Sequence, residues 1–195
     1  MPQDRRVRKS QAAIRHAFID LLHKYELEQI TVQQISDLAD VNRSTFYTHY
    51  IDKYDLLEKL EDEQVEIIRT FIEEGDVYKN QTFSTESIRT IMEFLIGNIE
   101  KNMEFYQLMF TMGKDSNLHE KLYELITGHL NHFKNENNKI DDIPFSYFMS
   151  YVSGAGLSFI RHWVEDPNRI AKDDLIQHFY DIVNNGPATI IRRGE

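Results

Sequence analysis

Residues 42–49 carry side chains that could bind phosphates and the edges of nucleic-acid bases. An arginine, three hydroxyl residues, a tyrosine and a histidine lie within seven positions: Arg43, Ser44, Thr45, Tyr47, Thr48 and His49. Arginine and hydroxyl groups donate to phosphate oxygens and to base edges, and a threonine methyl can contact thymine. The alternative for each residue is an ordinary solvated surface, which polar side chains often form. The elements around this stretch favour the binding interpretation.

Two short helices joined by a tight turn would hold these side chains. Thr31 is a good N-cap, and Gln34 three residues later completes a capping box. Four apolar residues then recur at helical spacing: Val32, Ile35, Leu38 and Ala39. Asp40 occupies the turn, where a residue that tolerates left-handed backbone angles is needed, and Asn42 caps the second helix.

The aromatic residues of the second helix should point toward the protein core. Phe46 and Tyr50 are four residues apart, so both fall on the core side, opposite the polar residues. Asp52 caps a third helix, whose buried stripe is Leu56, Leu57 and Leu60. A longer amphipathic helix precedes the pair, with the stripe Ile14, Ala17, Phe18, Leu21, Leu22 and Tyr25.

Residues 5–60 resemble the DNA-binding domain of the TetR family of bacterial regulators. The resemblance rests on Ile30-Thr31-Val32, Ile35, Ala39, Val41, Ser44-Thr45-Phe46-Tyr47, His49-Tyr50, Asp52-Lys53 and Asp55-Leu56-Leu57. The family usually has Gly and Ser where this chain has Asp40 and Asn42. The resemblance implies a symmetric dimer, with the second helix of each pair in the major groove and a helical C-terminal domain that binds an inducer or partner. It implies phosphate contacts for Tyr47, His49 and Lys53 and a groove-facing position for Arg43, Ser44, Thr45 and Thr48. Thr31 is a further candidate DNA contact.

Composition and charge agree with an intracellular regulator. The net charge of -10 lies in residues 60–195, with 13 basic and 23 acidic residues, whereas residues 1–59 hold nine of each. Five of those basic residues lie within the first sixteen. The chain has no cysteine, no secretory signal and no apolar run of membrane-spanning length, so we expect a cytoplasmic protein without a membrane partner.

The remaining chain predicts an all-α protein with two domains, a three-helix DNA-binding domain over 1–53 and a regulatory and dimerisation domain over 54–195. We expect the third helix to break at Gly75 and loops over 76–84 and 135–142. Further helices are predicted over 85–100, 105–112, 117–133, 145–164 and 172–184, and no strand is predicted.

The helix over 145–164 is apolar on nearly all sides, so it should be buried on more than one side. Small residues over 153–156 would permit close approach of another helix. The last ~50 residues also resemble the C-terminal region of one TetR branch, through Gly154, Trp163 and Asp173-Asp174-Leu175. The resemblance implies a four-helix dimer interface, for which the candidate residues are Gly154, Gly156, Leu157, Ile160, Trp163, Phe179 and Ile182.

A ligand pocket could be lined by aromatic and methionine side chains at Phe94, Tyr106, Met109, Phe110, Phe148 and Tyr151. The alternative is that these residues are plain core. No nucleophile motif or phosphate loop is present, so we expect no enzyme, no catalytic residue and no cofactor. His129 and His132 could share a metal, but no third ligand is indicated, so no metal site is predicted.

These observations predict a homodimeric helix-turn-helix regulator that binds a double-stranded DNA operator. We expect a repressor released by a small-molecule effector. The alternatives are control by a protein partner or a metal, or a helical adaptor that binds proteins and not DNA.

Overall fold

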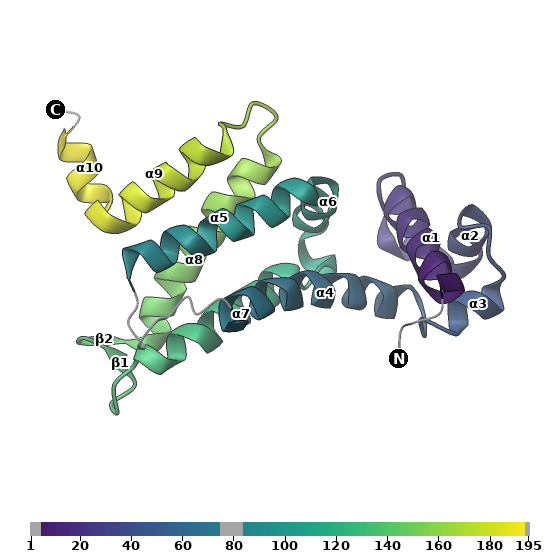
Figure 1. Cartoon of the computed structure of the whole chain (residues 1–195), viewed down its shortest axis with the longest axis horizontal. Coiled ribbons are helices and arrows are strands. Elements are labelled where there is room, and N and C mark those ends of the chain that lie inside the picture. Colours follow the sequence, from purple (N-terminus) through teal and green to yellow (C-terminus); the bar gives the residue numbers. More distant parts are fainter. Residues whose placement is uncertain (1–4, 75–83, 194–195) are drawn as a thin grey trace.

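The computed structural model describes residues 5–74 and 84–193, which form ten α-helices, three short 3-10 helices and one two-stranded sheet (Figure 1). The predicted break at Gly75 and most of the loop over 76–84 lie outside these residues. The helices are α1 (Arg5–Leu22), α2 (Val32–Leu38), α3 (Arg43–Tyr47), α4 (Lys53–Glu74), α5 (Thr85–Lys101), α6 (Met103–Met112), α7 (Leu118–Leu130), α8 (Phe145–Glu165), α9 (Lys172–Asn185) and α10 (Pro187–Arg193). The 3-10 helices are η1 (Leu27–Gln29), η3 (Gly113–Asp115) and η4 (Asn131–Phe133).

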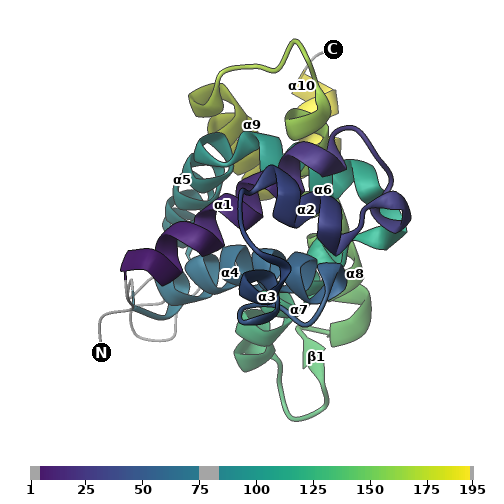
Figure 2. The same ribbon diagram turned by 90° about the vertical axis from the view of Figure 1, so that its right-hand side faces the viewer.

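The first three helices form a small unit at one end of the molecule (Figures 1 and 2). The predicted stripe of α1 is buried from Ile14 to Leu22, whereas Tyr25 lies on the turn after the helix and is exposed. Thr31 and Gln34 form the predicted capping box, with the Gln34 N–H donating to Thr31 Oγ1 at 3.2 Å and the Thr31 N–H donating to Gln34 Oε1 at 2.8 Å. The local sequence therefore sets where α2 begins.

Helix α4 leaves this unit and runs into the C-terminal body (Figure 1). Asp52 caps it as predicted, because its Oδ1 accepts hydrogen bonds from the backbone N–H groups of Tyr54 and Asp55. The predicted stripe is buried at Leu56, Leu57 and Leu60 and continues along the helix to Ile72. One long helix thus contributes to a single apolar core that includes buried residues of both the N-terminal unit and the body.

The body is built from α5 to α10 and the far part of α4, with α5 against α9, α4 against α7, and α8 against α6 and α7. All five predicted helices are present, with ends that differ by a few residues. The prediction of no strand was wrong: β1 (Lys139–Ile140) pairs antiparallel with β2 (Ile143–Pro144). Asp141, the first residue of the two-residue loop, adopts positive φ, which lets so short a hairpin turn. The chain also continues beyond Gly186 into α10, a helix that the sequence analysis missed.

Helix α8 is less enclosed in the single chain than its apolar sequence predicts. One side faces the core through Met149, Leu157 and Trp163, whereas Tyr147 and Tyr151 on the other side are 75% and 65% exposed. Among the described residues, no helix is both long and apolar enough to cross a membrane.

Candidate nucleic-acid interface

Helix α3 is short, and a turn, an N-cap and two buried aromatic residues hold it against the core. Asp40 in the turn before it has φ 52°, the left-handed conformation that the sequence predicted. Asn42 caps the helix, because its Oδ1 accepts from the Ser44 N–H at 3.0 Å. Phe46 and Tyr50 are both buried, and their ring centroids lie 5.5 Å apart. These contacts fix which face of α3 points outward.

The outward face presents several hydrogen-bonding groups. Arg43, Ser44, Tyr47 and Thr48 are exposed, and Thr45 is partly exposed. The guanidinium of Arg43 lies 3.5 Å from the Tyr47 hydroxyl, one helical turn further on. The Thr48 hydroxyl donates to the Thr45 carbonyl at 2.6 Å, so its methyl group and its two acceptor lone pairs are what it offers outward. Thr31 is also exposed, at the start of α2.

His49 is held by a residue that the sequence analysis did not identify. Its Nε2 lies 3.1 Å from Ser10 Oγ on α1, and that hydroxyl is 2.9 Å from the Val7 carbonyl. A serine has one hydroxyl proton, and the carbonyl can only accept, so Ser10 accepts from His49. The contact spans 39 positions, and no sequence pattern connects its two ends.

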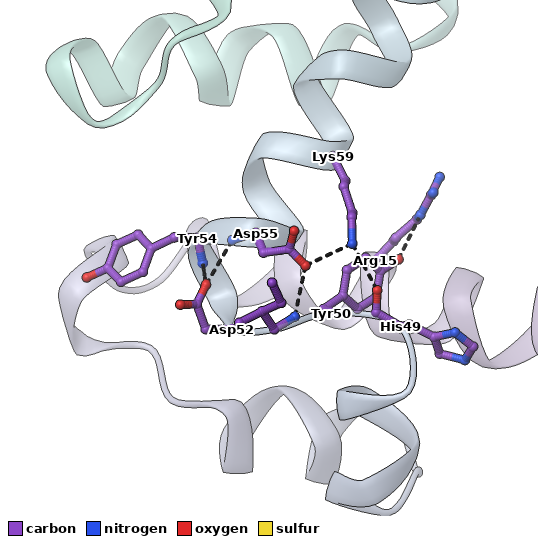
Figure 3. Close-up of polar contacts among 8 residues, drawn as sticks. Arg15, His49, Tyr50, Asp52, Tyr54, Asp55 and Lys59 are labelled. Atoms are coloured by element: carbon purple, nitrogen blue, oxygen red, sulfur yellow. Dashed lines mark hydrogen bonds and ion pairs between the residues drawn. The ribbon is translucent and has the colours of Figure 1, made fainter.

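A polar network joins the end of α3 to α1 and α4 (Figure 3). Asp55 Oδ2 accepts from the Ile51 N–H at 2.8 Å and from Lys59 Nζ at 2.9 Å, while Lys59 also donates to the His49 carbonyl. From α1, Arg15 donates to the Tyr50 hydroxyl at 3.2 Å. Desolvation raises the pKa of Asp55, but its hydrogen bonds outweigh this and leave the pKa below 3.8. The carboxylate is therefore charged at neutral pH and holds the turn after α3.

Lys53 occupies a different environment from the other candidate DNA contacts. Its Nζ donates to three backbone carbonyls, those of Leu27 at 2.7 Å, Glu28 at 2.9 Å and Ile30 at 2.8 Å. It is partly buried beside η1, at the first position of α4. The structure thus brings the candidates on α3 together on one surface and places Lys53 within the scaffold beneath it.

The predicted pocket residues lie in different surroundings. Tyr106, Met109 and Phe110 are buried in the core, and Phe148 is partly buried. The ring of Phe94 stacks on that of Phe71, with 3.7 Å between the ring centroids. Tyr151, by contrast, is an exposed residue of α8. Burial raises the pKa of Tyr106 to about 12, and its hydroxyl accepts a hydrogen bond from the Asn98 amide at 2.9 Å.

Two open grooves, of about 700 Å³ beside α4 and about 370 Å³ between α1 and the start of α6, are lined by none of these six residues. No cluster of three or more metal-ligating side chains occurs within residues 5–74 and 84–193.

The predicted interface residues divide into two groups. Gly154 and Ile182 are exposed, and Gly156 and Phe179 are partly exposed. Leu157, Ile160 and Trp163 are buried within the chain's own core, and the Trp163 indole donates to the Ile170 carbonyl at 2.8 Å. The four exposed or partly exposed residues are therefore the better placed of the candidates in the single chain, and the interface assignment stays a prediction, because helix periodicity does not show which apolar side faces the body.

Known proteins resemble this chain in sequence and in fold. A TetR-family model described as "Transcriptional regulator C-terminal region" matches residues 86–185, slightly more than half of the chain. The uncharacterized HTH-type transcriptional regulator YxbF of Bacillus subtilis (strain 168) is 38% identical over 58 residues, which cover 29% of this chain and only 15% of that protein.

Solved structures share the fold over most of the chain. The TetR transcriptional regulator of Streptococcus agalactiae 2603V is 22% identical, with a TM-score of 0.62, and the match covers 92% of this chain and 96% of that one. The fatty acid degradation regulator FadR of Bacillus halodurans is 16% identical, with a TM-score of 0.69 and coverage of 91% and 96%. The family model, the related sequence and the shared fold together place this chain in the TetR family of transcriptional regulators.

Proposed function

We propose that this regulator binds an operator in double-stranded DNA as a homodimer and represses transcription until a small-molecule effector releases it. The observation that carries the proposal is the outer face of α3, where Arg43, Ser44 and Tyr47 are exposed while Phe46 beneath them is fully buried. An anchored helix with exposed donors is what major-groove recognition requires.

The outward residues of α3 divide into two proposed roles. Arg43, Ser44, Thr45 and Thr48 would face the groove, where arginine and hydroxyl groups distinguish base pairs. Tyr47, with Thr31 at the start of α2, would contact the sugar-phosphate backbone. His49 would donate to a phosphate through Nδ1–H of its protonated form, because its Nε2–H is donated to Ser10. Backbone contacts fix the register of the protein on DNA but carry no sequence information.

Dimerisation would use the side of α8 that the single chain leaves uncovered, together with α9. Tyr147, Tyr151 and Gly154 on α8 and Ile182 on α9 are exposed. An apolar surface of this kind on a regulator points to a partner surface. A two-fold dimer presents its two recognition helices to half-sites ~34 Å apart or a small multiple of that.

A small-molecule effector is supported by analogy of fold. FadR of Thermus thermophilus, described as a TetR-family transcriptional repressor, was solved in complex with lauroyl-CoA and shares this fold at a TM-score of 0.58 and 17% identity. For the present chain we propose that an effector binds in the helical body, near Phe94, Tyr106, Met109, Phe110 and Phe148. We also propose that the protein acts in the cytoplasm. Control by a protein partner or a metal is the alternative.

The test is a gel-shift selection with DNA fragments that flank the protein's own gene. We expect one fragment to bind, Arg43→Ala to weaken its binding, and Lys114→Ala in η3, a matched loss of one exposed positive charge, to leave binding unchanged. An adaptor that binds only proteins would shift no fragment even at low ionic strength, and that result would refute the proposal.

A further inference from the structure

Lys53 has a full set of hydrogen-bond acceptors inside the protein. Its Nζ lies within 2.9 Å of three carbonyl oxygens, those of Leu27, Glu28 and Ile30. An ammonium group has three N–H donors and no acceptor. All three donors of Lys53 are therefore directed at backbone carbonyls, and a phosphate oxygen could replace one only by breaking a bond within the fold.

The three carbonyls belong to the connection between α1 and α2. Leu27 and Glu28 lie in η1, and Ile30 is its C-cap. The Leu27 carbonyl also accepts from the Ile30 N–H at 3.2 Å, so Lys53 is its second donor. Carbonyls at the end of a helix are commonly left without helical partners, and a cation satisfies them well. The side chains of Leu27 and Ile30 are buried in the core, and Lys53 binds the carbonyl oxygens of the same two residues. Packing and hydrogen bonds therefore both hold this stretch of backbone.

This connection determines where the DNA-binding helices begin. Ile30 directly precedes Thr31, the N-cap of α2, and Lys53 is the first residue of α4. Lys53 thus ties the start of α2 to the start of α4, and α2 and α3 lie between these two points in the chain. A movement of the connection would change the position of α3 relative to α4.

We propose that Lys53 is a positioning residue, which fixes the α2–α3 unit against α4 and does not neutralise a DNA phosphate. This inference departs from the phosphate contact that the family resemblance implies. Only its affinity measurement rests on the proposed DNA binding; the measurements on the free protein do not.

The first experiment separates the two roles without DNA. Lys53→Met keeps the length of the side chain and removes its donors. Lys53→Arg keeps the charge, but a planar guanidinium cannot direct three donors at one point between three carbonyls. We expect both variants to melt about 4 °C or more below the wild type, as the loss of charge-assisted bonds gives in a chain of this length. A melting temperature of Lys53→Arg equal to that of the wild type would overturn the proposal.

The second experiment uses the salt dependence of operator affinity. Each neutralised phosphate contributes about 0.9 to the slope of log K against log salt concentration. We expect Lys53→Met to weaken binding by the same factor at every salt concentration, so that the slope of log K against log salt concentration is unchanged. Lys24→Met is the control for the loss of one exposed charge. A slope that falls by about 0.9 in Lys53→Met but not in Lys24→Met would show a phosphate contact and overturn the proposal.

The two experiments fail independently. If the wild-type protein binds no DNA fragment, the proposed function is wrong, whereas the melting temperatures of the two Lys53 variants still test the positioning role.

Discussion

Ser116 donates its hydroxyl proton to the carboxylate of Glu61 at 2.7 Å, across 55 residues of sequence. Glu61 lies on α4 and is 1% exposed, and its carboxylate also accepts from the Asn117 N–H at 2.9 Å and lies 3.2 Å from Lys121 Nζ. A buried carboxylate is tolerated only when it is hydrogen-bonded and paired, as here. This cluster joins α4 to the start of α7.

The first prediction concerns the stability of this junction. Glu61→Ala should lower the free energy of unfolding by about 3 kcal/mol, because the Ser116 hydroxyl and the Asn117 N–H lose their buried acceptor, while Lys121 keeps its ion pair with Asp62 at 2.6 Å. Ser116→Ala should lower it by about 1–2 kcal/mol. Urea unfolding measures both, and Glu58→Ala, on the exposed side of α4, is the control, with an expected change within about 0.5 kcal/mol. Equal effects of all three substitutions would contradict the assignment.

The second prediction concerns the tautomer of His49. Because the hydroxyl proton of Ser10 is used on Val7, neutral His49 must carry its proton on Nε2. The ¹⁵N chemical shifts of the imidazole should report this tautomer in the wild type and in Ser10→Thr, which keeps the hydroxyl. Ser10→Ala should shift the signals toward a mixture and lower operator affinity several-fold. Identical ring shifts in the wild type and Ser10→Ala would show that Ser10 does not orient the ring.

The third prediction separates base contacts from backbone contacts on α3. Arg43→Ala should change which base is preferred at one operator position, since a good arginine–base pair gives about 1–3 kcal/mol of discrimination. Tyr47→Phe should weaken binding to all sequences by a similar factor, because it removes only a hydroxyl proposed to contact phosphate. Selection from a randomised operator library measures both effects. A uniform loss with Arg43→Ala would mean that this arginine contacts the backbone instead.

The fourth prediction concerns the proposed dimer. Apart from the adjacent residues and backbone of its own helix, no described atom lies within 4 Å of the position that a Cβ of Gly154 or Gly128 would take, so a side chain fits at both sites within one protomer. Gly154→Lys should nevertheless shift the protein to a monomer in sedimentation analysis, because it places a charge on the proposed α8 interface. Gly128→Lys, at an exposed position of α7, should remain dimeric. A dimeric Gly154→Lys variant would place the interface elsewhere.

The fifth prediction is a pH dependence of stability through His129. Burial lowers the pKa of His129 below 6.5, Glu73 opposes this effect, and Arg69 and His132 add to it. The unfolded chain therefore takes up the proton at a higher pH than the folded chain, so stability is fully present above about pH 6.5 and is lost as the pH falls below it.

Urea midpoints at pH 7.5 and 5.5 test this pH dependence. The decrease in midpoint should be smaller in His129→Gln than in the wild type, while His132→Gln should leave it nearly unchanged. The same decrease in the wild type and His129→Gln would rule out His129 as its source.

The sequence alone predicted the local structure around α2 and α3. The Thr31 and Gln34 capping box, the left-handed Asp40, the Asn42 cap and the buried Phe46 are all present. The caps and the turn depend on groups within a few positions of one another, so the residue types and their spacing specify them. The four-residue spacing of Phe46 and Tyr50 likewise predicts that both fall on one face of α3.

Only the tertiary structure determined which distant residues contact each helix. The Ser10–His49 bond and the Glu61 cluster join residues 39 and 55 positions apart, and Lys53 reaches carbonyls 23 to 26 positions away. Periodicity likewise marked α8 as apolar, but the packing of α6 and α7 determined that Trp163 is buried and Tyr151 exposed. A helical repeat specifies that an apolar face exists, whereas the neighbour that covers it depends on how the whole chain folds.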